Sequence, residues 1–192
     1  YGCSYYSKEI MDSVYDSARP EHRQKYEILL AHGGDDRHIP MKVNQIQSLG
    51  YDYVAMGHIH KPQELVENHM AYAGALEPID INDTGTHGYI EGRISEKGCQ
   101  IRFVCHASRE YIHKDVQVHR AMTGHNLKQE LVRMIEENGR QNMYKITLTG
   151  FRDPDIWYDL EQMDPCGNVV EIVDHTKPAY DFEKLSNENK GN

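Results

Sequence analysis

Three histidines stand directly after apolar stretches of the sequence, in positions where they could share a bound ligand. His32 follows the run 26–31 and precedes two glycines, while His58 and His60 follow "YDYVAMG" within the stretch G-H-I-H. In an extended segment, residues i and i+2 point in the same direction, so His58 and His60 can reach one centre or two adjacent centres. The neighbouring glycines allow the backbone to approach a bound ion closely.

The chemistry that suits neutral imidazole at such a place is coordination of Zn²⁺, Mn²⁺, iron or Ni²⁺. The chain contains 12 histidines, and we interpret most of the others as surface residues or as hydrogen-bonded core residues. For His32, His58 and His60, the alternative is a histidine turn that is held by hydrogen bonds and binds no metal.

The segments around these histidines predict an α/β layered fold. Residues 26–31 and 51–57 have the pattern of buried strands, and residues 41–49 between them have the spacing of a short helix that ends at Gly50. This order indicates a βαβ unit, and sheets of that kind place ligands at the carboxyl ends of their strands. Residues 1–6, "YGCSYY", are expected to form a further short strand.

From His69 to residue 106 the pattern changes to strands alone. "HMAYAGA", "GYIEGRIS" and "CQIRFVCH" are short, extended and separated by turn residues, and Lys97-Gly98 indicates a β-hairpin. We expect these strands to form a meander that packs on one side of the α/β core.

Residues 107–192 predict a separate small α+β domain. "REYIHKDVQVH", "MYKITLTG" and "GNVVEIVD" have strand patterns, and "NLKQELVRMIEENG" has a helical one. Asn126 suits the N-cap of that helix and Gly139 its C-terminal end. Asp153-Pro154 predicts the start of a second helix, because proline favours the first helical position. The expected order is therefore β-α-β-α-β.

The composition argues against several classes of protein. The formal net charge is −9, with 21 basic and 30 acidic residues, so the chain lacks the basic footprint of a typical nucleic-acid-binding domain. No apolar run reaches the roughly 20 residues that a membrane span needs. The four cysteines show no C-x-x-C spacing, which favours reduced thiols in a cytoplasmic protein.

Several stretches together resemble one known family. "ILLAHGG" followed by "YDYVAMGHIHKPQ" is similar to the last two metal motifs of the calcineurin-like metallophosphoesterases. "YAGALEPIDINDTGTHGYIEGRI" resembles the segment that follows this motif in bacterial DNA-repair exonucleases of the SbcD type. "YGCSYY" and "ASREYIHKDV" resemble the strand before the histidine motifs and the run into the capping domain. The resemblance implies that residues 1–106 are the C-terminal part of a phosphoesterase domain and that 107–192 are a capping domain.

The resemblance also implies a site with two divalent metals, usually manganese, with zinc, iron, nickel or magnesium as alternatives. Carried over by motif, His32 and His58 would bind one metal and His60 the other. Two metals about 4 Å apart clamp the attacking and leaving oxygens of a phosphodiester. The substrate would then be DNA, and the ions rather than the chain would supply positive charge.

Partners follow from the same resemblance: a coiled-coil ATPase subunit of the SbcC type and a second copy of the nuclease, with no membrane attachment. His87, Arg109 and Lys114 are candidates for contacts with nucleic acid. The alternatives are a histidine at the start of a strand and two solvated charges.

The chain departs from the family pattern in one respect. The family begins with D-x-H, G-D-x-x-D and G-N-H motifs, and none stands in the corresponding place here. Asp36-Arg37-His38 spells D-x-H but falls after the first strand-end histidine, and we interpret it as coincidence. We therefore expect a C-terminal portion of an exonuclease that has no catalytic residue of its own, is inactive alone and holds no metal or one.

Two other functions remain open at this stage. The first is a phosphatase or cyclic-nucleotide phosphodiesterase on the same fold. The second is a non-catalytic module that binds DNA or a partner protein without using a metal.

Overall fold

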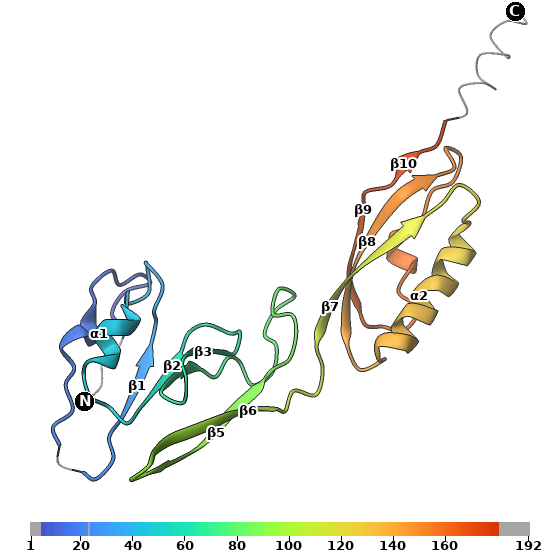
Figure 1. The fold of residues 1–192 in the computed structure, drawn as a ribbon. Coiled ribbons are helices and arrows are strands. Elements are labelled where there is room, and N and C mark those ends of the chain that lie inside the picture. Colours follow the sequence, from blue (N-terminus) through green and yellow to red (C-terminus); the bar gives the residue numbers. More distant parts are fainter. Residues whose placement is uncertain (1–4, 23, 181–192) are drawn as a thin grey trace, which may run out of the picture. The chain divides into compact units, whose positions relative to one another are not determined.

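The computed structural model describes residues 5–22 and 24–180, which divide into two compact units. Within these residues, the first unit runs to Ile79 and includes Thr86–Ser108, and the second comprises Asp80–Gly85 and the chain from Arg109 onward. Both units combine strands with few helices (Figure 1), so the α/β class expected from the sequence is confirmed. The assignment of the units to a phosphoesterase domain and a capping domain stays a prediction.

The first unit is built on a four-stranded sheet in the order β1-β2-β4-β3. β1 (Ile28–His32) is parallel to β2 (Tyr53–Gly57), and the helix α1 (Val43–Gln47) connects them as the predicted βαβ unit. β4 (Met70–Tyr72) adds parallel to β2, and β3 (Gln63–Val66) pairs antiparallel with β4. The expected meander is wrong for β4, because its three buried residues extend the central sheet.

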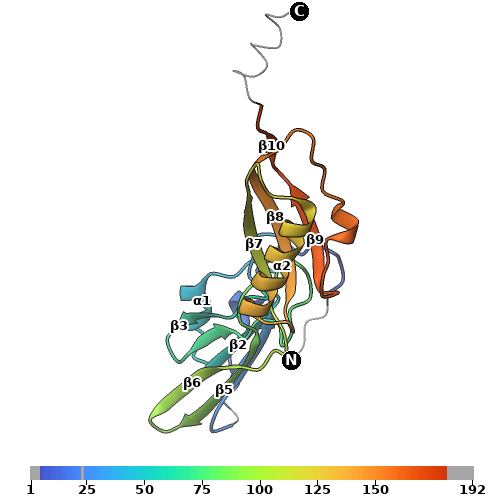
Figure 2. The ribbon, with the colours of Figure 1, turned by 90° about the vertical axis from the view of Figure 1, so that its right-hand side faces the viewer.

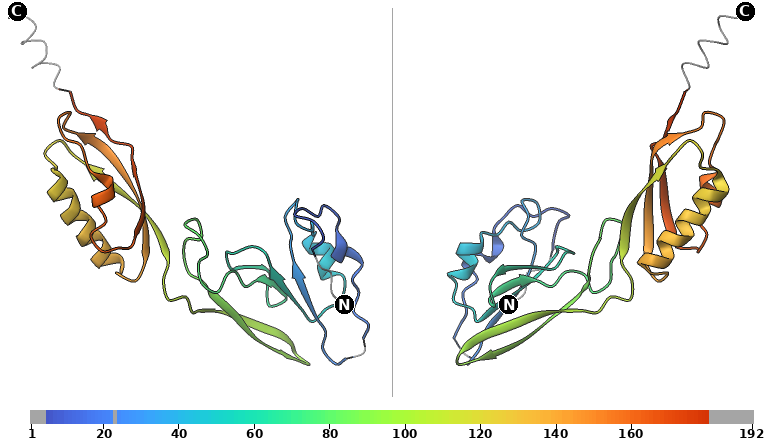
Figure 3. Two further views of the ribbon diagram at one scale, coloured as in Figure 1. Left: turned by 180° about the vertical axis from the view of Figure 1, so that it is seen from behind. Right: turned by 45° about the vertical axis from the view of Figure 1, so that its right-hand side comes forward.

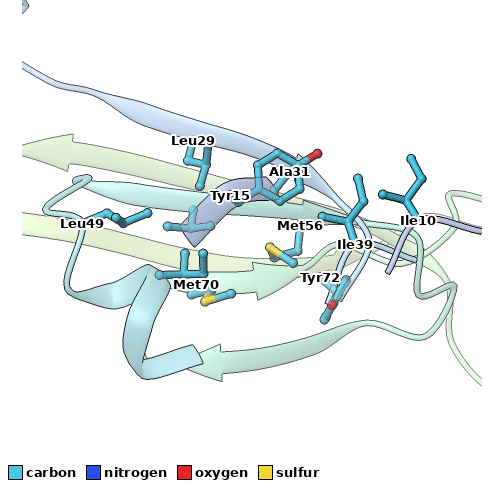
Figure 4. Close-up of a cluster of buried hydrophobic side chains, with 11 residues drawn as sticks. Ile10, Tyr15, Leu29, Ala31, Ile39, Leu49, Met56, Met70 and Tyr72 are labelled. Carbon is cyan, nitrogen blue, oxygen red and sulfur yellow. The ribbon is translucent and has the colours of Figure 1, made fainter. Parts of the chain in front are cut away.

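The core of this unit forms on one face of the sheet. Burial alternates along β1, where Leu29 and Ala31 are buried while Leu30 is 77% exposed. Figure 4 shows these two side chains gathered with residues of β2, β4 and the segments before β1 and after it. The labelled members of this cluster are Ile10, Tyr15, Leu29, Ala31, Ile39, Leu49, Met56, Met70 and Tyr72. Tyr15 comes from the short 3₁₀ helix η1 (Val14–Ser17).

A two-stranded hairpin follows the central sheet in the first unit. β5 (Gly88–Ser95) and β6 (Gly98–Cys105) pair antiparallel along their whole length, from Gly88 opposite Cys105 to Ser95 opposite Gly98. Gly98 has a φ of 106°, a conformation that glycine adopts without strain. The hairpin predicted at Lys97-Gly98 is thus confirmed.

The second unit packs one helix against a sheet whose strands all pair in parallel. β7 (Tyr111–Val118), β8 (Met143–Arg152) and β9 (Val169–Asp174) are parallel neighbours, and β10 (Lys177–Pro178) pairs with the end of β8. Figure 2 and both panels of Figure 3 show α2 (Gly124–Asn138) lying along one face of this sheet. The fully buried residues at this contact are Leu127, Leu131 and Ile135 from α2 and Tyr144, Ile146 and Leu148 from β8.

The predicted ends of α2 need one correction. Its N-cap is Thr123 and not Asn126: the backbone N–H of Asn126 donates to Thr123 Oγ1 at 3.2 Å, and the Asn126 side chain accepts from the Thr123 N–H. Asn126 therefore occupies the third helical position of a capping box, a place usually held by Glu or Gln. The expected end at Gly139 is confirmed, with a φ of 104°.

The second helix predicted at Asp153-Pro154 is wrong. The Asp153 carboxylate accepts the N–H of Asp155 at 3.0 Å, and Arg152 donates to the Ile156 carbonyl at 3.0 Å. The bond to Asp155 is the one an N-cap makes, but the Ile156 N–H donates to the Asp153 carbonyl at 3.1 Å and closes a single turn that does not continue as a helix. A 3₁₀ helix, η2 (Leu160–Gln162), follows further along this stretch.

Three remaining predictions concern local features. Residues 1–4 of the expected "YGCSYY" strand lie outside the described residues, and Tyr5 and Tyr6 are not in a strand. Cys99, Cys105 and Cys166 are free thiols. None of the helices in the described part of the chain is long and apolar enough to cross a membrane.

Candidate metal centre

The parallel pairing of β1 and β2 brings two of the predicted ligands together. His32, the last residue of β1, is paired in register with Gly57, the last residue of β2, and His58 follows directly. The ring centroids of His32 and His58 lie 5.4 Å apart, with 66° between the ring planes. The two imidazoles therefore share one edge of the sheet, as the sequence spacing predicted.

His32 is exposed at the end of β1, is held by its backbone, and has surroundings that lower the pKa of its imidazole. Its N–H donates to Tyr15 Oη and its carbonyl accepts from Tyr5 Oη, both at 3.3 Å. Burial lowers the pKa of the His32 imidazole, and the neighbouring His58 and other histidines lower it further. The neutral ring is the form that can bind a metal ion.

A tight loop after β1 turns back towards the same edge. Gly33 and Gly34 have φ angles of 139° and 115°, which strongly favour glycine, and the Gly34 N–H donates to the His38 carbonyl at 2.8 Å. The Tyr72 hydroxyl from β4 donates to the Gly33 carbonyl at 2.8 Å and fixes the loop to the sheet.

Asp35 lies in this loop and is held at four points. Its Oδ1 accepts from the backbone N–H groups of Arg37 and His38, both at 2.9 Å. The His38 ring donates from Nδ1 at 2.8 Å, and the His58 ring donates from Nε2 to Oδ2 at 2.7 Å. The hydrogen bond from His58 is the largest of the effects that lower the pKa of the Asp35 carboxyl well below its usual range.

This carboxylate and its two histidines form a compact donor set. One ligand atom each from Asp35, His38 and His58 lies within 4.8 Å of the others. Within the described residues, this is the group of histidine, cysteine and acidic side chains that is close enough to hold a metal ion. Imidazole nitrogen and carboxylate oxygen are donors that first-row divalent metals accept.

The other predicted site residues in the first unit, His60 and His87, differ in their exposure to solvent. His60 is exposed, its carbonyl accepts the N–H of Ala75 at 2.8 Å, and its ring is close enough to lower the pKa of His32. Its role as a ligand stays a prediction. His87 is 1% exposed and donates from Nδ1 to the Ala75 carbonyl at 3.1 Å.

Arg109 and Lys114 belong to the second unit, where Arg109 is exposed and Lys114 is half-buried. Contact of His87, Arg109 and Lys114 with nucleic acid stays a prediction.

The sequence analysis missed Asp35 and interpreted the D-x-H spelling that ends at His38 as coincidence. The D-x-H spelling drew attention to Asp36, which is exposed, whereas the carboxylate that reaches the site belongs to the residue before it. A usable signal was present: an aspartate directly after two glycines favours a turn in which the side chain accepts a backbone N–H two residues on. That turn fixes Asp35 beside His38 and leaves Oδ2 directed at His58.

Comparison with known proteins agrees with this class of site. No protein-family model matches the chain. A curated protein of Bacillus subtilis (strain 168), the uncharacterized metallophosphoesterase YhaO, is 33% identical over 97 residues, a match that covers 46% of this chain. The chain spans 24% of the length of that relative. The chain is therefore similar to a metallophosphoesterase over nearly half its length.

Proposed function

We propose that this chain is part of a metal-dependent phosphoesterase that hydrolyses phosphodiester bonds in DNA, with His32, His58 and His60 as metal ligands. The observation that carries the proposal is the meeting of His32 and His58 at the carboxyl edge of two parallel strands, 5.4 Å apart between ring centroids. The similarity to a metallophosphoesterase supports the reaction class.

The residues at this edge fit a divalent metal by their chemistry. His32 is exposed, but partial desolvation and neighbouring histidines lower the pKa of its imidazole, which favours the neutral form that coordinates a metal. Asp35 supplies the negative charge that three imidazoles lack. A bound divalent ion would lower the pKa of a water towards about 7 and so supply a nucleophile at neutral pH.

The choice of DNA as substrate rests on the resemblance of the segment after the G-H-x-H motif to exonucleases of the SbcD type. The formal charge of −9 does not oppose it, because ions in the site would attract the phosphate backbone. Manganese is the proposed metal. A coiled-coil ATPase of the SbcC type and a second copy of the chain are the proposed partners.

The test is a substrate panel with the full-length gene product in the presence of Mn²⁺. We expect cleavage of linear double-stranded DNA and of bis(p-nitrophenyl) phosphate, with much slower release from the monoester p-nitrophenyl phosphate. Hydrolysis confined to the monoester or to cyclic nucleotides would replace the nuclease with a phosphatase or a cyclic-nucleotide phosphodiesterase. DNA binding without any metal-dependent hydrolysis would indicate the non-catalytic module.

A further inference from the structure

The His58 ring makes its hydrogen bond through one nitrogen, Nε2. Within the described residues, the ring is hydrogen-bonded from Nε2 to Asp35 Oδ2 at 2.7 Å. An ionised carboxylate can only accept, so Nε2 must carry the proton. In a neutral imidazole the other nitrogen, Nδ1, then has a free lone pair.

The carboxylate that imposes this arrangement is itself fixed. Two backbone N–H groups, those of Arg37 and His38, donate to Oδ1, and the His38 ring lies 2.8 Å from both oxygens. The loop that carries Asp35 is in turn closed by the bond between Gly34 and the His38 carbonyl. Asp35 is therefore placed by its own loop, independently of His58.

The distances favour a hydrogen bond over direct coordination by Asp35. Two ligand atoms about 2.0–2.1 Å from a tetrahedral metal lie roughly 3.3 Å apart. The separation of 2.7 Å between His58 Nε2 and Asp35 Oδ2 is shorter than this and is the length of a charge-assisted hydrogen bond.

We propose that Asp35 is a positioning residue that fixes the orientation and tautomer of His58 and so leaves Nδ1 as the metal-binding atom. The inference rests on the proposed metal site and deepens it, since it assigns the ligand atom and names the residue that selects it. Carboxylates placed behind metal-bound histidines raise the basicity of the ligand and hold its ring in one orientation.

The sharpest variant is Asp35→Asn, because it keeps the shape of the loop. Asn Oδ1 can still accept the two backbone N–H groups, which places the NH₂ group opposite His58 Nε2. That group is a donor, so the ring must turn into an acceptor at Nε2 and carry its proton on Nδ1. Asp36→Asn makes the same change of charge at the exposed neighbouring residue and serves as the matched control.

The first readout needs no metal. In the ¹⁵N-histidine-labelled 192-residue chain, the His58 signal is identified by its loss in His58→Gln. Long-range ¹H–¹⁵N correlation then reports which ring nitrogen is protonated. We expect the Nε2–H form in the natural chain and in Asp36→Asn, and a shift to the Nδ1–H form in Asp35→Asn. An Nδ1–H form in the natural chain, or the same tautomer in all three proteins, overturns the inference.

The second readout is Mn²⁺ affinity of the full-length gene product by isothermal titration calorimetry. Asp35→Asn should weaken binding by roughly 10- to 100-fold, the usual effect of losing such a partner, and Asp36→Asn should leave it within about twofold. If both variants weakened Mn²⁺ binding equally, the effect of Asp35 would come from its negative charge alone and the inference would be overturned. If the natural protein binds no divalent metal, the proposed function and the assignment of Nδ1 as a ligand atom both fail, while the tautomer measurement still decides whether Asp35 sets the tautomer of His58.

Discussion

At the residue scale, the candidate site depends on Asp35, whose carboxylate accepts from the His58 ring at 2.7 Å and from the Arg37 N–H of its own loop at 2.9 Å. His32 and His58 could be predicted because each directly follows an apolar strand, and the ends of parallel strands share an edge. Asp35 could not be placed in this way, because it stands 23 residues before His58 and its position depends on the path of a glycine loop. The fold of that loop is decided by backbone angles and not by a spacing in the sequence.

Gly34 offers a test of this loop. A Cβ at Gly34 would overlap the Tyr72 hydroxyl, and the φ of 115° is one that L side chains rarely adopt. We expect Gly34→Ala to lower the free energy of unfolding by about 1–3 kcal/mol through backbone strain alone, with a further loss from displacing Tyr72. Urea denaturation followed by circular dichroism measures the change.

Gly50→Ala is the matched control for that experiment. Gly50 also has a positive φ, 91°, but a Cβ there would meet nothing within 4 Å. Gly50→Ala should therefore lower the free energy of unfolding through backbone strain alone, without steric overlap. An effect of Gly34→Ala no greater than that of Gly50→Ala would contradict the packing described for Tyr72.

At the scale of elements, the buried face of a helix could be predicted from its periodic pattern, whereas the residues that begin or prevent a helix could not. The face of α2 formed by Leu127, Leu131 and Ile135 follows from helical spacing, and all three residues are fully buried. The helix begins after Thr123, and the sequence did not indicate this N-cap, because a capping box usually has Glu or Gln and not asparagine at its third position. The second helix is missing although Asp153 makes a bond typical of an N-cap, because the chain closes only one turn there, from the Ile156 N–H to the Asp153 carbonyl.

The contact between α2 and its sheet predicts the effect of one substitution. Leu131 is fully buried in the core cluster of the second unit, so Leu131→Ala removes apolar contacts and leaves a cavity. We expect a loss of about 2–5 kcal/mol in the free energy of unfolding. Gln129→Ala, at an exposed position of the same helix, should change it by no more than about 0.5 kcal/mol. Similar values for the two variants would mean that this face of α2 does not support the core.

At the scale of the whole molecule, the chain contains two units with separate cores, and the residues proposed to bind metal belong to the first. The α/β class was predictable because strand and helix patterns alternate along the sequence. The joining of β4 to the central sheet was not, since a strand of three residues carries too short a pattern to indicate its neighbour.

The central claim is that His32 and His58, at the ends of β1 and β2, bind a divalent metal with which the protein hydrolyses phosphodiesters. It is tested most directly by Mn²⁺-dependent cleavage of linear DNA by the full-length gene product carrying His58→Ala. His125→Ala, at an exposed position in the second unit, is the control.

Removal of a metal ligand should weaken Mn²⁺ binding by more than the roughly 10- to 100-fold expected for loss of a residue, such as Asp35, that hydrogen-bonds to the ligand. We therefore expect cleavage and Mn²⁺ binding to fall by more than about 100-fold in His58→Ala and to stay unchanged in His125→Ala. Metal-dependent cleavage that survives His58→Ala at the natural rate would contradict the account.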